Sequence, residues 1–234
     1  MITFDDVSFA YQGGIPDGSE PLALRHIHFH AERGECIVLC GKSGCGKTTM
    51  LRMVNGLVPH FYQGRLEGDI TVGNVHIKEA SLPQVAAVAG SVFQNPRTQF
   101  FHLDTTGEMA FNMENLNIPH DKMVERLKET AWKLDIQTLM DRDIFQLSGG
   151  EKQQIACGSV YASMPEVIVM DEPSSNLDME SIRKLQDLIR TMKDEGKTIL
   201  ISEHRLWYLE DIADRYVLLK DGQIENEFTS DEIL

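Results

Sequence analysis

The chain has 234 residues, of which 42% are hydrophobic, and a formal net charge of −14 at pH 7, which suits one large domain or a core with an insertion. An acidic chain lacks the basic stripe that binds a phosphate backbone, so we expect no nucleic-acid partner. With no apolar run of about eighteen residues and no signal core at its start, it is predicted to be soluble and cytosolic.

The first segments indicate antiparallel β-structure. Residues 2–9 are a predicted strand, and a turn rich in Gly, Pro, Asp and Ser covers residues 13–21. In a second predicted strand, residues 24–31, alternation places His26, His28 and His30 on one face. Three imidazoles on one side are compatible with a metal site. We favour the ordinary interpretation, a half-buried strand with its polar face in solvent.

A glycine-rich loop follows the apolar strand that starts at Cys36 and leads into a helix. The pattern Gly-x4-Gly-Lys-Thr predicts that loop N–H groups wrap the α- and β-phosphates of a nucleotide. Lys47 then reaches the β- and γ-phosphates, and the Thr48 hydroxyl takes Mg²⁺. The helix that begins near Lys47 directs the positive end of its dipole at the same anion. The candidate loop residues are Gly41, Lys42, Ser43, Gly44, Cys45, Gly46, Lys47, Thr48 and Thr49.

Tyr11 lies just ahead of this predicted nucleotide fold. An aromatic ring in that place can stack on adenine. An ordinary aromatic residue at the end of a strand is almost as good an interpretation of the sequence.

The middle of the chain changes from strands to helices. A helix is predicted over residues 48–56, and strands over residues 68–72 and 85–93, the second ending at Gln94. From residue 95 to about 145 helical patterns follow, which predicts a helical insertion in an α/β core. Several apolar residues there form either core or an adaptable docking surface, core being favoured for any single one. They are Phe100, Phe101, Met109, Phe111 and Met113.

Two later stretches carry further chemistry. Ser148, Gly149 and Gly150 precede a predicted helix that runs to about residue 163, and N–H groups with a hydroxyl at a helix start form a second anion site. The apolar strand from residue 167 ends in Asp171 and Glu172. One carboxylate of such a pair suits Mg²⁺ coordination and the other suits activation of water.

Taken together, these residues resemble the nucleotide-binding subunit of an ABC transporter almost from end to end. The family pattern matches, in order, the phosphate loop at residues 41–49, Gln94, the signature motif at residues 147–153, the Asp171–Glu172 pair, residues 175–178 and His204.

Within the family, two short stretches are similar to the energy-coupling factor group, which imports vitamins or transition-metal ions. They are Gln-Asn-Pro at residues 94–96, with Gln99 and Phe100 just beyond, and Ser-Glu-His-Arg at residues 202–205. Chains of this family usually continue beyond the point where this one stops, at Leu234, into a short extra domain or a second ATPase half.

The resemblance implies a fold: a P-loop NTPase (RecA-like) α/β core with an N-terminal antiparallel β subdomain and a helical insertion subdomain. Residues 1–234 are then one ABC ATPase domain. Residues 1–94 and 154–234 form the nucleotide-binding core with its β subdomain, and residues 95–153 form the insertion that carries the signature motif.

The resemblance also implies roles at an ATP and Mg²⁺ site. Adenine stacks on Tyr11, and Lys47 with the rest of the loop holds the phosphates. Mg²⁺ is held by Thr48, Gln94 and Asp171. Glu172 polarises the attacking water, and His204 contacts the γ-phosphate. In this family the signature of one subunit serves the ATP of a facing subunit, so an identical or related ATPase domain is expected as a head-to-tail partner.

Transmembrane transporter subunits are the other implied partners, which place the chain in the cytoplasm, peripheral on the inner face of the membrane.

Three alternative functions stay open. A DNA-repair or chromosome ATPase needs long coiled-coil arms between Gln94 and Leu147, and a translation ATPase normally has two such domains and a basic linker. A nucleotide sensor that binds ATP without hydrolysis is disfavoured by Glu172 and His204.

Overall fold

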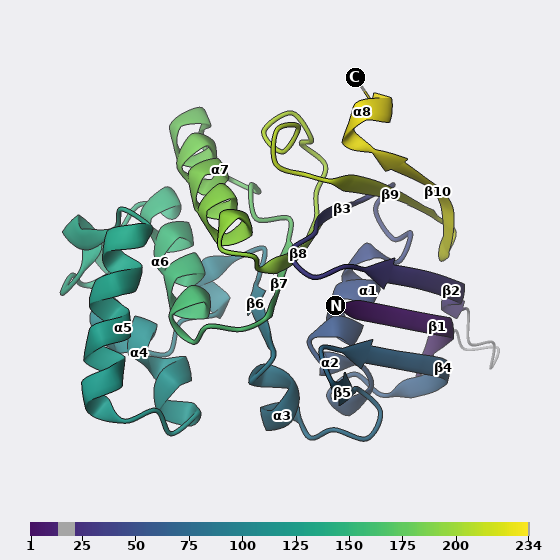
Figure 1. The fold of residues 1–234 in the computed structure, drawn as a ribbon, viewed down its shortest axis with the longest axis horizontal. Coiled ribbons are helices and arrows are strands. Elements are labelled where there is room, and N and C mark those ends of the chain that lie inside the picture. Colours follow the sequence, from purple (N-terminus) through teal and green to yellow (C-terminus); the bar gives the residue numbers. More distant parts are fainter. Residues whose placement is uncertain (14–21, 234) are drawn as a thin grey trace.

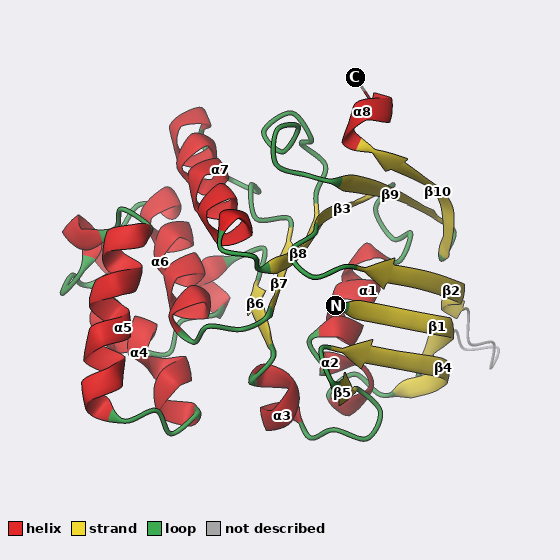
Figure 2. Cartoon of the chain, in the orientation of Figure 1, coloured by secondary structure: helices red, strands yellow, loops and turns green. Residues whose placement is uncertain are grey.

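The computed structural model describes residues 1–13 and 22–233. Figures 1 and 2 show an antiparallel sheet on one side, a larger sheet in the middle and a lobe of helices on the other side. This arrangement confirms the predicted α/β core with a β subdomain and a helical insertion. The turn expected at residues 13–21 lies outside the described residues except for Gly13.

The antiparallel sheet has the strand order β2-β1-β4-β5. Its strands are β1 (Ile2–Tyr11), β2 (Leu22–Ala31), β4 (Gly64–Val72) and β5 (Val75–His76). In β2, Ile27 and Phe29 are buried whereas His26, His28 and His30 are exposed. The predicted alternation is therefore confirmed, because one face of this sheet packs on the core and the other meets solvent.

The larger sheet has six strands in the order β10-β9-β3-β8-β7-β6. All neighbours are parallel except β9 and β10. Its strands are β3 (Cys36–Cys40), β6 (Ala89–Val92), β7 (Val167–Asp171), β8 (Thr198–Ser202), β9 (Arg215–Lys220) and β10 (Gln223–Thr229). A parallel strand that is buried on both faces has a continuous run of apolar residues in its sequence. The run in β3 follows this rule, with Val38 in one hydrophobic core and Leu39 in the other.

The helices cover both faces of the six-stranded sheet (Figure 1). One hydrophobic core lies between this sheet and the helical lobe with α7, and the other lies between the two sheets, around α1. The helices are α1 (Lys47–Val54), α2 (Leu57–His60), α3 (Leu82–Ala86), α4 (Thr105–Asn115), α5 (His120–Lys133), α6 (Gly149–Ala162), α7 (Met179–Asp194) and α8 (Ser230–Ile233). Short 3-10 helices are η1 (Pro96–Thr98), η2 (Gln137–Leu139) and η3 (Ile144–Gln146).

The strand predicted over residues 85–93 is wrong at its start. Val85 lies in α3, and β6 begins only at Ala89. The reason is a capping box at Ser81, whose side chain and that of Gln84 bond the backbone reciprocally, together with a proline at the start of the helix. These signals favour a helix start over an extended apolar run.

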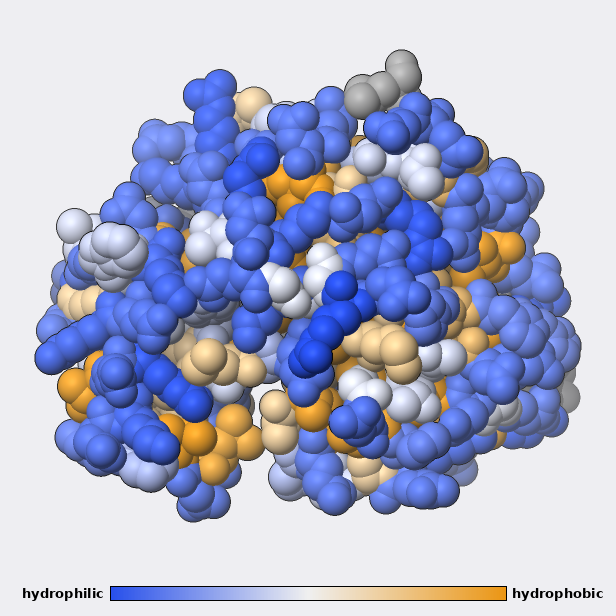
Figure 3. Space-filling view, in the orientation of Figure 1, coloured by the Kyte–Doolittle hydropathy of each residue, from blue (hydrophilic) through white to orange (hydrophobic). Residues whose placement is uncertain are grey.

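The surface is mostly hydrophilic on the face drawn in Figure 3, with hydrophobic residues on both sides of a notch between the helical lobe and the rest. No helix within residues 1–13 and 22–233 combines the length and the apolar character required to cross a bilayer.

Candidate nucleotide-binding site

The phosphate loop joins the end of β3 to the start of α1, as the sequence predicts. Gly41 has φ 138° and Gly46 has φ 113°, backbone values that residues with a side chain rarely adopt. A Cβ on Gly41 would lie 2.3 Å from the carbonyl oxygen of Leu219, and one on Gly46 would lie 2.7 Å from a methyl carbon of Leu24. Both glycines are therefore required by the path of the loop and by its packing, in addition to any demand from a nucleotide.

Lys47 is turned into the loop that precedes it. Its side chain is buried, and Nζ donates to the carbonyl oxygens of Gly41 at 2.8 Å and Lys42 at 3.2 Å. These bonds offset the cost of burying an ammonium group. They also hold the positive charge inside the curve of the loop, where an anion would meet it.

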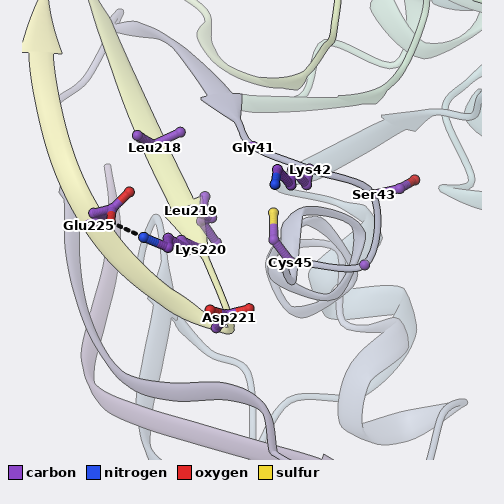
Figure 4. A pocket seen from close by; sticks show the side chains of 10 residues that line it. Gly41, Lys42, Ser43, Cys45, Leu218, Leu219, Lys220, Asp221 and Glu225 are labelled. Atoms are coloured by element: carbon purple, nitrogen blue, oxygen red, sulfur yellow. Dashed lines mark hydrogen bonds and ion pairs between the residues drawn. The ribbon is translucent and has the colours of Figure 1, made fainter.

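A hollow of about 600 Å³ lies beside the loop. Figure 4 shows it between the loop residues 41–45 and the hairpin of β9 and β10, where Lys220 pairs with Glu225 at 2.7 Å. Thr48 and Asp171 are not among the described residues that line it; they line a separate cavity of about 100 Å³. Thr48 and Asp171 therefore lie outside this hollow.

Asp171 accepts two hydroxyl hydrogen bonds at one carboxylate oxygen. Thr48 Oγ1 donates to Asp171 Oδ1 at 3.2 Å, and Ser202 Oγ donates to the same atom at 2.5 Å. Asp171 and Ser202 meet because the carboxyl ends of the neighbouring parallel strands β7 and β8 share one edge of the sheet, and Thr48 comes from the start of α1. A carboxylate beside hydroxyl groups is the oxygen donor set that Mg²⁺ prefers, so these residues fit that ion. Sequence reasoning missed Ser202, although its position at the end of an apolar strand near His204 was a usable signal.

Glu172 lies between two other candidate residues. Gln94 Nε2 donates to Glu172 Oε2 at 2.9 Å, and His204 Nε2 lies 3.2 Å from Glu172 Oε1. The Glu172 side chain is 26% exposed, so water can reach a carboxylate whose orientation is fixed from two sides. Its φ of 45° is unusual for a non-glycine residue, and such backbone conformations gather at functional sites.

Tyr11 is half-buried at the end of β1, beside α1. Its hydroxyl shares a hydrogen bond of 3.1 Å with Thr49 Oγ1, and its ring meets those of Phe9 and Tyr62 edge to face. Arg52 lies over the Tyr62 ring at 4.2 Å. The tyrosine thus lies next to the last residue of the phosphate loop.

The signature residues form the start of α6. Ser148 Oγ accepts a hydrogen bond from the N–H of Glu151 at 3.2 Å, and Glu151 Oε2 accepts one from the N–H of Ser148 at 2.7 Å. The backbone bond from Ser148 lowers the pKa of Glu151 below its ordinary value, with help from Arg142 at 2.8 Å. The Ser148 hydroxyl keeps its own proton to donate.

The structure does not bring Ser148, Gly149 and Gly150 to the phosphate loop. Figure 1 shows α6 in the helical lobe, on the far side of the six-stranded sheet from α1. Within the described part of the chain, no hydrogen bond joins these residues to residues 41–49. The signature of this chain therefore lies away from its own phosphate loop.

The three histidines of β2 pair with carboxylates on the exposed face of the sheet. His26 lies 2.8 Å and His28 lies 3.6 Å from Asp6, while His30 lies 3.0 Å from Glu32. Over residues 1–13 and 22–233, no group of three His, Cys, Asp or Glu side chains has the arrangement of a metal site. These contacts are surface pairs, which contribute little to stability.

Comparison with known proteins agrees with this geometry. The family model described as ABC transporter matches residues 24–175. A Treponema denticola protein described as an ABC transporter ATP-binding protein is 47% identical over 227 residues, covering 97% of this chain and 45% of the relative. A Pyrococcus horikoshii protein with the same description is 37% identical, covering 100% of this chain and 81% of the relative. The chain therefore belongs to the ABC transporter family.

Solved structures share the whole fold. The cbiO1 protein of Clostridium perfringens, part of the ABC transporter complex cbiONQ, superposes with a TM-score of 0.86 at 25% identity, covering 99% of this chain and 89% of that one. A dimeric ATP-binding cassette, MJ0796, with ADP and Pi, superposes with a TM-score of 0.83 at 22% identity, covering 98% and 99%. This chain spans about half the length of the Treponema relatives, 45% of one and 46% of the other.

Proposed function

We propose that this chain is the ATP-binding and ATP-hydrolysing subunit of a membrane transporter, of the energy-coupling factor type that imports a vitamin or a metal ion. The observation that carries the proposal is the arrangement around Glu172, held between Gln94 and His204. Beside it, Asp171 is bonded to Thr48 of the phosphate loop.

In this proposal the loop binds the phosphates of ATP. Lys47 exchanges its carbonyl partners, Gly41 and Lys42, for the β- and γ-phosphates, and adenine stacks on Tyr11. Mg²⁺, held by Thr48, Gln94 and Asp171, supplies charge neutralisation at the phosphates.

Glu172 then takes a proton from the attacking water as the general base. Gln94 and His204 fix the direction of its carboxylate, and His204 also contacts the γ-phosphate.

Lys47→Ala should severely weaken ATP binding without unfolding the domain, because it removes the buried cation at the centre of the loop. Binding stabilises a folded protein by RT ln(1 + [L]/Kd), about 2.7 kcal/mol at a hundredfold excess over Kd. A thermal-shift titration with ATP should give this gain for the wild type and much less for the variant.

Lys128→Ala is the matched control, since the Lys128 side chain is exposed on α5, outside the phosphate loop. We expect it to respond to ATP as the wild type does. Equal stabilisation of all three proteins by ATP would refute the role of Lys47.

We further propose that a second ATPase domain, identical or related, faces this one head to tail. The separation of the signature from the loop in one chain supports it, as do the dimeric form of the cassette MJ0796 and the double length of the Treponema relatives.

The proposed domain limits are those inferred from the sequence. One domain covers residues 1–234, and its helical insertion, residues 95–153, ends within α6.

The surface proposed for the membrane partner is a groove of about 330 Å³ between α3, β6 and α4. Hydrophobic residues flank the notch visible there in Figure 3. Phe101, 73% exposed, lines the groove and stacks on Phe111 at 4.8 Å, whereas Met109 and Met113 are fully buried. An exposed apolar groove suits a helix from a transmembrane subunit, which would keep the chain at the inner face of the membrane. The relation of cbiO1 to a transporter complex supports the energy-coupling assignment.

Phe101→Asp should abolish co-purification with the transmembrane subunits while ATP binding stays intact, because a carboxylate would be desolvated in the groove. Trp132→Asp is the matched control, since this aromatic residue on α5 is 74% exposed and outside the groove. Loss of the complex with both variants, or loss of folding with Phe101→Asp, would contradict this assignment of the groove.

A further inference from the structure

Glu203 is a buried carboxylate next to the Glu172–His204 pair. It follows β8, stands immediately before His204 and is only 3% exposed. In the described part of the chain no Lys, Arg or His side chain forms an ion pair with it. A buried charge without a counter-charge persists only where hydrogen-bond donors surround it.

Four donors meet this carboxylate. Oε1 accepts from the backbone N–H of His204 at 2.7 Å and from that of Arg205 at 3.2 Å. Oε2 accepts from the hydroxyl of Tyr208 at 2.8 Å and from the backbone N–H of Ser174 at 3.3 Å. Tyr208 is fully buried, and burial, followed by the charge of Glu203, raises its pKa above the ordinary value. The hydroxyl therefore stays protonated as a donor.

These bonds join two separate segments of the site. Ser174 is two residues after Glu172, in the loop between β7 and α7, and His204 is in the turn after β8. The N–H of Glu203 itself donates to the carbonyl oxygen of Leu39 in β3 at 3.3 Å. The Glu203 side chain thus fixes the backbone next to both members of the Glu172–His204 pair, and its backbone N–H ties this turn to the strand that leads into the phosphate loop.

We propose that Glu203 is a positioning residue for ATP hydrolysis: it holds the turn of His204 in register with Glu172 and takes no part in binding ATP. The inference rests on the function proposed for Glu172 and His204. A carboxylate can accept all four bonds, whereas an amide of the same shape has only one accepting oxygen. Glutamine would therefore leave an N–H group of the backbone opposite its own NH₂ group.

Glu203→Gln should lower kcat roughly tenfold, since bonds to a charged acceptor are lost, while KM for ATP stays within about twofold of the wild type. Glu67→Gln is the matched control, because it makes the same carboxylate-to-amide change at an exposed glutamate of β4. We expect this variant to turn over as the wild type does.

A double-mutant cycle with His204→Ala separates positioning from general structural support. If Glu203 acts through His204, Glu203→Gln should cause no further loss of kcat in the His204→Ala background. A full tenfold loss in that background, or equal changes in kcat and KM, overturns the proposal. Should Glu203→Gln fail to fold, Tyr208→Phe provides the same cycle, because it removes one donor to Glu203 and keeps the ring. We expect this variant to lose less kcat than Glu203→Gln, and to cause no further loss in the His204→Ala background.

The outcomes also distinguish the two levels of the proposal. A His204→Ala variant that hydrolyses ATP at the wild-type rate contradicts both the proposed site and the role of Glu203. A slow His204→Ala variant beside wild-type rates for Glu203→Gln and Tyr208→Phe overturns the role of Glu203 alone.

Discussion

Glu172→Gln should lower the rate of ATP hydrolysis by roughly 10²–10⁴ while ATP still binds. The amide cannot take a proton from water, but it has the shape of the carboxylate and keeps an oxygen that can accept the bond from Gln94. Phosphate release measures the rate, and a thermal shift with ATP measures binding. With hydrolysis blocked, the ATP-bound dimer should accumulate on a sizing column.

Glu67→Gln is a suitable control, because Glu67 is an exposed glutamate on β4 whose partner is Arg65 at 3.8 Å. It should hydrolyse ATP at the wild-type rate. Unchanged turnover by Glu172→Gln would show that another group serves as the base and would reopen the alternative of a nucleotide sensor.

Lys47→Ala and Ser148→Arg chains should each be nearly inactive alone and active when mixed. In the proposed dimer each ATP site is formed by Lys47 of one chain and Ser148 of the other. In either homodimer both sites therefore carry a substitution. In a mixed dimer one site carries both lesions and the other none. Random pairing makes about half of the dimers mixed, so an equal mixture should approach roughly a quarter of the wild-type rate if one intact site turns over.

Two controls accompany this experiment. Thermal unfolding should show that Ser148→Arg still folds, since Ser148 also caps α6 and loss of a cap costs about 1 kcal/mol. A mixture of Lys47→Ala with Lys47→Ala/Ser148→Arg has no intact site and should stay inactive. If the first mixture shows no recovery and Glu172→Gln with ATP remains monomeric, the chain does not pair with itself, and a different ATPase half is its partner.

Motifs that are local in sequence could be predicted from the residues. The phosphate loop depends on glycine φ values and on the start of α1, all within residues 41–49. The signature depends on a capping box between Ser148 and Glu151, three residues apart. The exposed histidines of β2 follow from alternation along one strand. Interactions between near neighbours in the chain determine these features, so the sequence alone was sufficient for them.

Local signals also competed, and one expectation failed for that reason. The apolar residues after Gln84 are typical of a strand, yet the Ser81 capping box places Val85 in a helix. Composition could not separate Phe101 from Met113 either, since both are large and apolar and lie close to the same helix. Packing against the core buries Met113 and leaves Phe101 exposed at the groove.

The family, the phosphate loop and the identity of the catalytic candidates follow from the sequence alone. How those candidates meet depends on contacts between distant segments of the chain. Gln94, Glu172 and His204 come together after the ends of three neighbouring parallel strands, β6, β7 and β8, because parallel strands place their carboxyl ends at one edge. The same edge surrounds Glu203 with donors from two loops. A buried carboxylate acquires such a role through contacts between distant segments, which local sequence patterns do not encode.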